Sequence, residues 1–406
     1  MEDLIPYIVM PFVVAFVGWA TNVVGLQMMF YPVQWRGVGK SIGWQGIIPR
    51  IRERFTRDLV TKTVVKVCTP AEMLNALNDD DALGEMSVLI RSQIEEAVDD
   101  FMQSNGVKLW SIAPDMARQR VYKRILHDIP SISRLVIREI TENREYLLDI
   151  ETLAVSRAKE RPEILGELIL SMFGTEFRFM KISGLYIGFP LGCLQALCWY
   201  FMPINALLPL FGCLVGALTN WIALNILAYP ARGVKFLNWE LQGLVLKRQK
   251  DVSLSFAEVF TEKFLNTKDV LEFIWDGERG DEIKRMIKRQ LRNHMESKLF
   301  SKGIDLSVRL ASRDELYDEK ALKVLESNIF PLLDNSKVSR TLVKPVQMLL
   351  TMRMQQMPPE QFQELFLPIF QHDKWLVIIV GAMLGGAAGL LQLLVLFSDG
   401  PIFSIG

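Results

Sequence analysis

Charged residues are absent from three long stretches of this chain. The sequence contains 46 basic and 46 acidic residues, yet none of them occurs in 4–35, 182–231 or 375–398. A helix that crosses a bilayer needs about 20 predominantly apolar residues. The first and last stretches are each long enough for one span, and the middle stretch is long enough for two. The sequence therefore predicts an all-α integral membrane protein with four transmembrane helices, at 5–29, 183–202, 206–228 and 375–397.

Two long charged segments, 36–181 and 232–374, connect the predicted spans. Neither contains a convincing apolar–polar alternation, and apolar residues recur at helical spacing, so we expect two long, wholly helical lobes. Basic residues flank the spans on the lobe side, among them Arg36, Arg178 and Arg232. Because positive flanks mark the cytoplasmic side of a membrane protein, both lobes are predicted to be cytoplasmic.

One polar motif occurs twice, about half a chain apart. Gly18-x-x-Thr21-Asn22 leads to Tyr31-Pro32, and Gly216-x-x-Thr219-Asn220 leads to Tyr229-Pro230, at an offset of 198 residues. Further matches follow at an offset of 197, including Gln45-Gly46 with Gln242-Gly243. We interpret these matches as a duplication of the whole chain.

The two predicted copies are 1–203 and 204–406, and each consists of a span, a helical lobe and a second span. The first has its spans at 5–29 and 183–202 around the lobe 36–181, and the second at 206–228 and 375–397 around the lobe 232–374. Each copy crosses the membrane twice, so the second copy starts on the same side as the first. The sequence thus predicts parallel repeats, related by a pseudo-two-fold axis along the membrane normal.

Two short motifs predict helix starts at corresponding places in the copies. Thr69 lies three residues before Glu72, and Asn266 lies three residues before Asp269. Such a pair can cap a helix, because the first side chain accepts from the backbone three residues on and the acid reaches back.

A row of glycines occurs at every fourth position in each closing span. The rows are Gly184, Gly188 and Gly192 in the first copy, and Gly381, Gly385 and Gly389 in the second. Small residues at this spacing let two helix backbones approach closely in lipid. We expect the glycines to pack spans together, within one chain or between chains, and a thin path for an ion or a lipid tail is the alternative.

The repeated polar motif is the main candidate site within the predicted spans. Its members are Thr21, Asn22 and Gln27 in the first copy, and Thr219, Asn220 and Asn225 in the second. An amide in hydrocarbon must find hydrogen-bond partners. We expect Asn22 and Asn220 to meet in the membrane and to bond between the copies, and a functional polar site near the axis is the alternative.

Basic residues that follow the first span of each copy are candidates for contact with anionic lipid headgroups. They are Arg50, Arg52 and Arg54 in the first copy, and Lys247 and Arg248 in the second. Solvated charges that only set the topology are the alternative.

The sequence contains no motif that indicates an enzyme, a metal site or a cofactor. The histidines His127, His294 and His372 lack metal-ligand spacing, and no phosphate-binding loop or nucleophile motif occurs. The net charge is zero, which argues against nucleic acid as a partner. We expect a non-enzymatic protein whose partners are membrane lipids and further copies of itself.

Three segments carry a resemblance to a known family. They are Gly18-x-x-Thr21-Asn22 with Phe30-Tyr31-Pro32, Gly46-Ile-Ile-Pro49-x-Ile-Arg52, and Pro368-x-Phe370-x-His-Asp373-Lys-Trp375 running into Gly381 and Gly385. Together they resemble the bacterial membrane proteins grouped as domain of unknown function 445 (YheB-like and YjiN-like proteins), over essentially the whole chain. In the second copy Leu246 stands in place of the proline. The resemblance implies a multi-pass protein of the bacterial cytoplasmic (inner) membrane and supplies no activity.

Three functions fit this sequence. The first is a membrane scaffold or envelope-organising protein that self-associates as a homo-oligomer. The second is a carrier of lipid or of a hydrophobic solute, with apolar grooves in the lobes. The third is a channel or small-solute transporter that uses the paired Thr-Asn motifs. We predict the first of these.

Overall fold

The structure of the chain is a computed structural model. It describes residues 5–39, 42–76, 88, 91–104, 108–142, 149–202, 204, 206–236, 239–277, 280–294, 336–371 and 374–396.

The chain forms two compact units, and each is built from segments that are far apart in the sequence. Unit 1 contains Met1–Thr63, Arg157–Phe256 and Met354–Gly406, and unit 2 contains Val64–Ser156 and Ala257–Arg353. Each unit draws on both halves of the sequence. The division into copies at residue 203 is therefore not a division between compact units, and it stays a prediction about the origin of the sequence.

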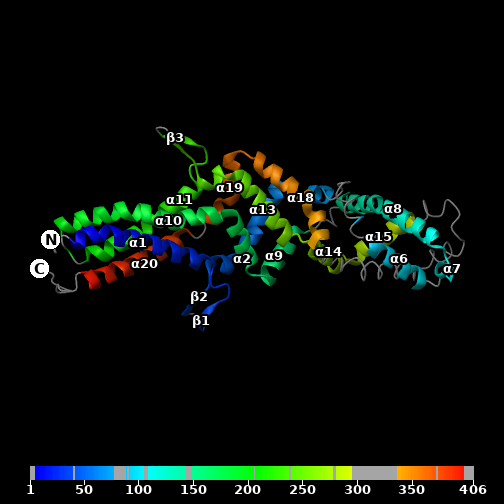
Figure 1. Ribbon diagram of the computed structural model, residues 1–406, viewed down its shortest axis with the longest axis horizontal. Coiled ribbons are helices and arrows are strands. Elements are labelled where there is room, and N and C mark those ends of the chain that lie inside the picture. The colour runs from blue at the N-terminus through cyan, green and yellow to red at the C-terminus, as the bar shows by residue number, and fades with distance from the viewer. Residues whose placement is uncertain are drawn as a thin grey trace. The chain divides into compact units, whose positions relative to one another are not determined.

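Four helices of unit 1 are long and apolar enough to cross a membrane. They are α1 (Ile5–Phe30), α10 (Ile164–Phe201), α11 (Leu207–Ala228) and α20 (Lys374–Leu396). The four predicted spans are thus confirmed as spanning-length helices, with a break between α10 and α11. Helix α1 lies along α10, and α11 lies along α20 (Figure 1).

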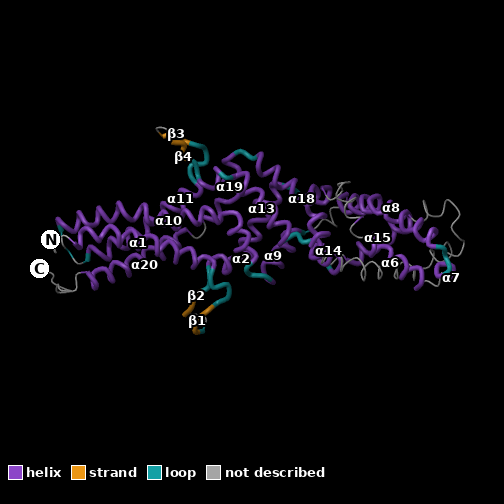
Figure 2. Tube along the Cα trace, viewed as in Figure 1, coloured by secondary structure: helices purple, strands orange, loops and turns teal. Residues whose placement is uncertain are grey.

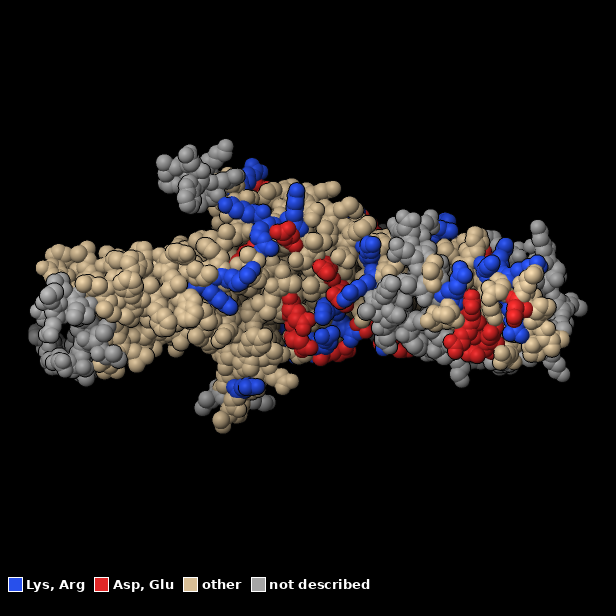
Figure 3. Space-filling view, in the orientation of Figure 1, with Lys and Arg blue, Asp and Glu red and all other residues tan. Residues whose placement is uncertain are grey.

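The surface of these four helices is apolar. Large side chains such as Phe12, Tyr186, Leu210 and Leu391 are more than half exposed. On the face shown in Figure 3, the part of unit 1 formed by the four helices carries no Lys, Arg, Asp or Glu over most of its length. A contiguous apolar surface of this kind requires an apolar environment, such as the interior of a bilayer.

Helix α10 extends well beyond its predicted span. It begins at Ile164, whereas the charge-free stretch begins at Ile182. Loss of charge marks the apolar part of a helix and not its start. The first half of α10 buries Leu168, Met172 and Phe173 in unit 1, which extends the helix into the polar region.

Two short β-hairpins interrupt the helical segments after α1 and α11 (Figure 2). Strands β1 (Arg36–Val38) and β2 (Ile42–Trp44) pair antiparallel, with Gly37 opposite Gly43. Strands β3 (Val234–Phe236) and β4 (Trp239–Leu241) pair in the same way. The prediction of wholly helical lobes is wrong here, because strands of three residues are too short to show an alternating pattern. The Tyr–Pro bond ahead of each hairpin is cis.

Shorter helices pack at the end of the four long ones and complete unit 1. They include α2 (Ile47–Leu59), α12 (Leu244–Lys247), α19 (Pro359–Gln371) and the first part of α13 (Gln249–Lys263), which continues into unit 2 after Phe256. Helix α9 (Ile150–Glu160) begins in unit 2 and ends in unit 1. Their core is aromatic: the ring of Phe366 lies 5.8 Å from Phe173, 6.0 Å from Phe256 and 5.0 Å from Phe362, centroid to centroid. Edge-to-face arrangements of this kind stabilise a core beyond simple burial.

Among the described residues of unit 2, helices are the regular secondary structure. Its helices include α4 (Pro70–Ala76), α6 (Arg91–Ser104), α7 (Lys108–Ser111), α8 (Asp115–Glu142), α14 (Thr267–Asp276) and α15 (Gly280–His294), and α18 (Ser336–Gln356) begins in it. A small core joins Leu74, Ile283 and Met286 from α4 and α15.

The predicted cap is confirmed in full at Thr69, and at Asn266 the side chain caps the helix through the residue two positions on. The backbone N–H of Glu72 donates to Thr69 Oγ1 at 3.3 Å, and the backbone N–H of Thr69 donates to the Glu72 carboxylate at 2.8 Å. In the second case Asn266 Oδ1 accepts from the backbone N–H of Lys268 at 3.3 Å. These bonds satisfy N–H groups that have no partner inside the helix.

Candidate functional site

The Thr-Asn motif of α1 lies inside unit 1 and contacts α10. Asn22 is fully buried, and its Nδ2 donates to the backbone carbonyl oxygen of Met180 at 2.7 Å. Thr21 is also buried, and its hydroxyl donates to the carbonyl oxygen of Gly18 at 3.0 Å. The amide therefore joins the two long helices of the first half.

The motif of α11 repeats this arrangement with α20. Asn220 Nδ2 donates to the carbonyl oxygen of Val377 at 2.8 Å, and the Thr219 hydroxyl donates to Val215 at 2.9 Å. We expected the asparagines to bond between the copies. The structure instead places each bond inside its own half, where the neighbouring helix offers a backbone acceptor.

The third member of each motif does not join the first two. Gln27 is exposed near the end of α1 and lines a cavity there. Asn225 is half-buried, and its Nδ2 donates to Trp221 of its own helix at 2.7 Å. The intramembrane polar motif is thus reduced to Thr-Asn pairs, one in each half.

Further buried amides lie in α10 and α20, outside the polar motif predicted from the sequence. Gln195 is 1% exposed and Gln392 is 7% exposed. Neither amide atom of Gln195 has a hydrogen-bond partner within the described chain, nor does Nε2 of Gln392. Their only sequence signal is that they are amides three residues after the last glycine of each row.

The glycine rows hold the long helices together within the chain. A Cβ on Gly18 would lie 2.6 Å from the carbonyl oxygen of Gly184, and a Cβ on Gly184 would overlap the same atom of Gly18. A Cβ on Gly188 would lie 2.8 Å from the Cα of Ala15, and one on Gly192 would lie 2.6 Å from the Cα of Pro11. Only glycine permits this approach of α1 to α10.

The second row has the same role between α11 and α20. A Cβ on Gly381 would lie 2.5 Å from the carbonyl oxygen of Gly216, and Gly385 faces Gly212 in the same way. A Cβ on Gly389 would lie 2.5 Å from the carbonyl oxygen of Leu208. Both rows thus pack helices within one chain, while packing between chains and a path for an ion or a lipid tail stay predictions.

The basic residues after α1 and α11 have different surroundings. Arg50, Arg54 and Lys247 are exposed. Arg52 is half-buried and donates to the carbonyl oxygen of Pro49 at 2.9 Å. For all of these residues, contact with lipid headgroups stays a prediction.

Arg248 is engaged inside unit 1. Its Nη1 donates to both carboxylate oxygens of Glu176, at 2.9 and 3.1 Å, and Glu176 is only 2% exposed. A buried carboxylate needs such a partner. This ion pair accounts for the position of Arg248 without any lipid, and lipid contact stays a prediction here too.

An apolar cavity of about 400 Å³ lies between α1 and α20. Val13, Val17 and Ala20 line it from α1, and Leu384, Ala388 and Gln392 line it from α20. Its wall is almost entirely apolar, and Gln392 and Thr21 are the polar side chains that reach it. A volume of a few hundred Å³ is typical of ligand-binding cavities.

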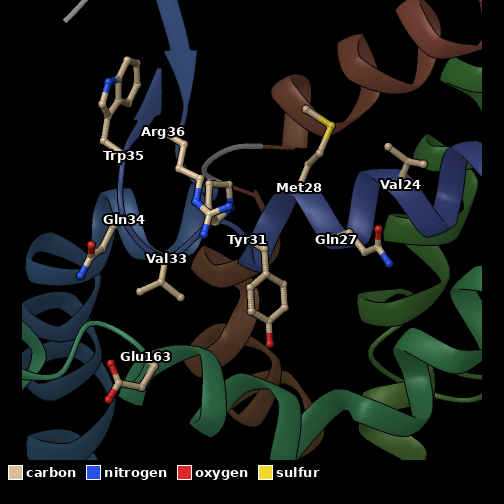
Figure 4. A pocket seen from close by; sticks show the side chains of 10 residues that line it. Val24, Gln27, Met28, Tyr31, Val33, Gln34, Trp35, Arg36 and Glu163 are labelled. Atoms are coloured by element: carbon tan, nitrogen blue, oxygen red, sulfur yellow. The ribbon is translucent and has the colours of Figure 1, made fainter. Parts of the chain in front are cut away.

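A second cavity, of about 770 Å³, lies where α1 ends. Gln27 and Tyr31 line it from the last turn of α1 and the residue that follows, Trp35 and Arg36 from the start of the hairpin, and Glu163 from the residue before α10. In Figure 4 the side chain of Arg36 extends from the hairpin in the direction of Val33 and Tyr31. The lining of this cavity mixes apolar side chains with amides and with charges of both signs, and because of these groups we call it the polar cavity.

The two cavities share Val24 as a lining residue. The lining residues of both cavities follow one another at helical spacing along α1. For the apolar cavity they are residues 13, 16, 17, 20, 21 and 24. For the polar cavity they are residues 24, 27 and 28, with residue 31 just after the helix. One face of α1 therefore carries a continuous path that is apolar along the helix and polar at its end.

Metal-ligating side chains and a buried thiol are the other groups to consider in the parts of the chain that the structure describes. No group of three or more His, Cys, Asp or Glu side chains there could hold a metal ion. Burial raises the pKa of the Cys68 thiol to about 11, and the nearby Glu72 carboxylate adds to the effect. A thiol with this pKa stays protonated at neutral pH and is a poor nucleophile.

Comparison with protein-family models, with curated proteins and with solved structures finds no match for this chain.

Proposed function

We propose that this protein is a non-enzymatic, multi-pass membrane protein that binds a membrane lipid along one face of α1. This is closest to the second of the three functions considered, with the groove among the spans and not in the lobes. The observation that carries the proposal is the pair of cavities that meet at Val24, apolar between α1 and α20 and polar beyond. A lipid likewise has an apolar tail that is followed by a polar head group.

The length of the apolar cavity supports an acyl chain as its occupant. From Val13 to Val24 a helix rises about 16 Å. The hydrocarbon core of a bilayer is about 30 Å thick, so the cavity follows α1 through roughly one leaflet. A fatty-acyl tail of a lipid in that leaflet has the direction and the apolar surface that the cavity requires.

A pair of neighbouring alanines in α20 provides the test. Ala388 lines the apolar cavity, whereas its neighbour Ala387 is exposed and does not line it. Lipid bound to the purified protein is measured by native mass spectrometry after extraction in mild detergent. The wild type and Ala387→Leu should retain lipid in a fixed ratio to protein, and Ala388→Leu should lose most of it. Equal retention by all three proteins would refute the proposal.

We also propose that the chain is a parallel internal duplication. The hydrogen bonds of the two halves support this. Asn22 to Met180 corresponds to Asn220 to Val377, and Gln45 to Val33 corresponds to Gln242 to Ala231. Donors and acceptors in each pair differ by 197 or 198 residues, the offsets that relate the two sequence segments.

The setting that we propose is the bacterial inner membrane, with the charged lobes in the cytoplasm. The four apolar helices support a membrane location. The basic residues next to them support the orientation. Membership of the family grouped as domain of unknown function 445 remains part of this proposal and rests on the motifs quoted above.

Self-association as a scaffold and transport of a small solute stay predictions. The glycine rows that suggested self-association are occupied by contacts within the chain, as for Gly18 with Gly184. The asparagines that suggested a transport path each bind a backbone carbonyl of the adjacent helix. Neither function gains a specific contact from the structure.

A further inference from the structure

We infer that the polar cavity at the end of α1 binds the head group of the same lipid, and that this head group contains a phosphate and a primary ammonium. The inference rests on the proposed function, because it requires a lipid tail between α1 and α20. It adds the class of lipid and the residues that select it.

The polar cavity has the composition of a membrane–water boundary. Tyr31 and Trp35 line it and are 60% and 43% exposed. These two residue types are enriched where a span leaves the hydrocarbon. Gln27, one turn before Tyr31, adds an amide to the same wall (Figure 4). A head group attached to a tail in the apolar cavity would therefore lie at this level.

Arg36 is the residue that would hold the phosphate. It is exposed at the first position of β1 and lines the cavity. Within the described part of the chain, no carboxylate forms an ion pair with it. A guanidinium donates two parallel hydrogen bonds to phosphate oxygens, and Tyr31 and Gln27 line the same cavity.

Glu163 determines the net charge of the head group that fits. Its carboxylate lines the same cavity and lies 3.4 Å from Nε of Arg161, which is a loose, half-exposed ion pair. A carboxylate facing the ligand opposes a head group with net negative charge and attracts an ammonium. The combination with Arg36 favours a zwitterionic phospholipid such as phosphatidylethanolamine over phosphatidylglycerol.

In the second half of the chain the corresponding carboxylate has a basic partner. Glu360 stands 197 residues after Glu163, and Arg232 forms an ion pair with it directly. At the position that corresponds to Arg232 the first half has the neutral residue Gln34. In the first half, Arg36 and Glu163 both line the cavity and do not form an ion pair with each other, so each charge is available to one end of a zwitterionic head group.

The test measures which lipid the full-length protein retains. The protein is reconstituted in nanodiscs of equimolar dioleoyl-phosphatidylethanolamine and dioleoyl-phosphatidylglycerol, then transferred to detergent and analysed by native mass spectrometry. We expect about a fivefold preference for phosphatidylethanolamine, the scale of one exposed ion pair. Arg36→Gln should lower retention of both lipids about tenfold, as expected for loss of a charged hydrogen bond. Glu163→Gln should abolish the preference with total retention largely kept.

Arg178→Gln is the matched control, since Arg178 is an exposed arginine of α10 that lines neither cavity. It should behave as the wild type. A preference for phosphatidylglycerol, or a ratio that does not respond to Glu163→Gln, would overturn the inference. If Ala388→Leu still displaces lipid in that case, the proposed function stands and only the head-group assignment fails. If Ala388→Leu displaces nothing, both fail.

Discussion

The side-chain amide of Asn22 donates a hydrogen bond of 2.7 Å to the backbone carbonyl oxygen of Met180, 158 residues along the chain. It joins α1 to α10 in the region where the glycines bring the two backbones together. The bond is an element of packing, and its replacement should weaken the helix pair without abolishing it.

Asn22→Leu should lower the free energy of unfolding by about 1 kcal/mol, the scale of an interhelical hydrogen bond in a membrane. Asn225→Leu is the control, because Asn225 bonds only within its own helix, and it should change stability much less. The measurement is reversible unfolding in mixed detergent micelles. An unchanged stability for Asn22→Leu would mean that this bond does not hold the helices.

The close approach of α1 and α10 predicts a strong difference between two glycines of α10. Gly184→Ala places a methyl group against the backbone of Gly18, whereas Gly174→Ala meets no atom within 4 Å. Gly184→Ala should cost about 2 kcal/mol of stability, and Gly174→Ala should be neutral or stabilising by up to about 1 kcal/mol. Equal effects in the same unfolding measurement would contradict the packing described here.

The buried ion pair of Arg248 and Glu176 predicts a non-additive effect. Arg248→Met leaves the Glu176 carboxylate buried without its partner, which should cost about 3 kcal/mol. Adding Glu176→Gln removes the buried charge and should restore more than half of this loss. The unfolding free energies of the two single variants and the double variant form the measurement. If the losses simply add, the two side chains do not form the pair seen here.

The cap of α4 predicts a pH dependence. The pKa of Glu72 is lowered to about 2, chiefly by the hydrogen bond from Arg353 and then by those with Thr69. Since the folded pKa lies below the ordinary value of 4.5, this contribution to stability is fully present above that value. It is lost as the pH falls toward the folded pKa.

Hydrogen exchange in α4 measures this contribution. Protection factors of the amides in Pro70–Ala76 should fall as the pH is lowered from about 5 to about 2. Glu72→Gln keeps a capping amide but removes the charge that pairs with Arg353, so at neutral pH it should lower the free energy of exchange by up to about 1 kcal/mol and should flatten the pH dependence. Glu96→Gln, at an exposed acid of α6, should leave the profile of α4 as in the wild type. A profile unaffected by Glu72→Gln would contradict the assignment.

The sequence predicts the four long helices well because the bilayer imposes a coarse requirement. Charge must be absent over about 20 residues, and this can be counted without a structure. Local caps such as Thr69 with Glu72 are also predictable, since donor and acceptor lie within one turn. The early start of α10 and the short strands β1 and β3 are not, because packing decides them.

The partners of the polar residues could not be predicted from the sequence. The repeat indicates that Asn22 and Asn220 are equivalent, but equivalence does not say what either one contacts. The acceptors are backbone carbonyls of Met180 and Val377, and a backbone acceptor has no sequence signal. The cavity at Val24 likewise depends on which helices are neighbours, so a search for motifs does not find it.

A lipid tail between α1 and α20 is the central claim, and photo-crosslinking tests it most directly. The full-length protein is placed in vesicles that contain a phosphatidylethanolamine with a photoactivatable group in its acyl chain. After irradiation, the labelled peptides are mapped by mass spectrometry. We expect the labelling to be concentrated at the cavity-lining residues of α1 and α20, such as Val17 and Ala388. This labelling should be lost in Ala388→Leu. Labelling spread evenly over exposed residues such as Phe189 and Leu210, unchanged in the variant, would contradict it.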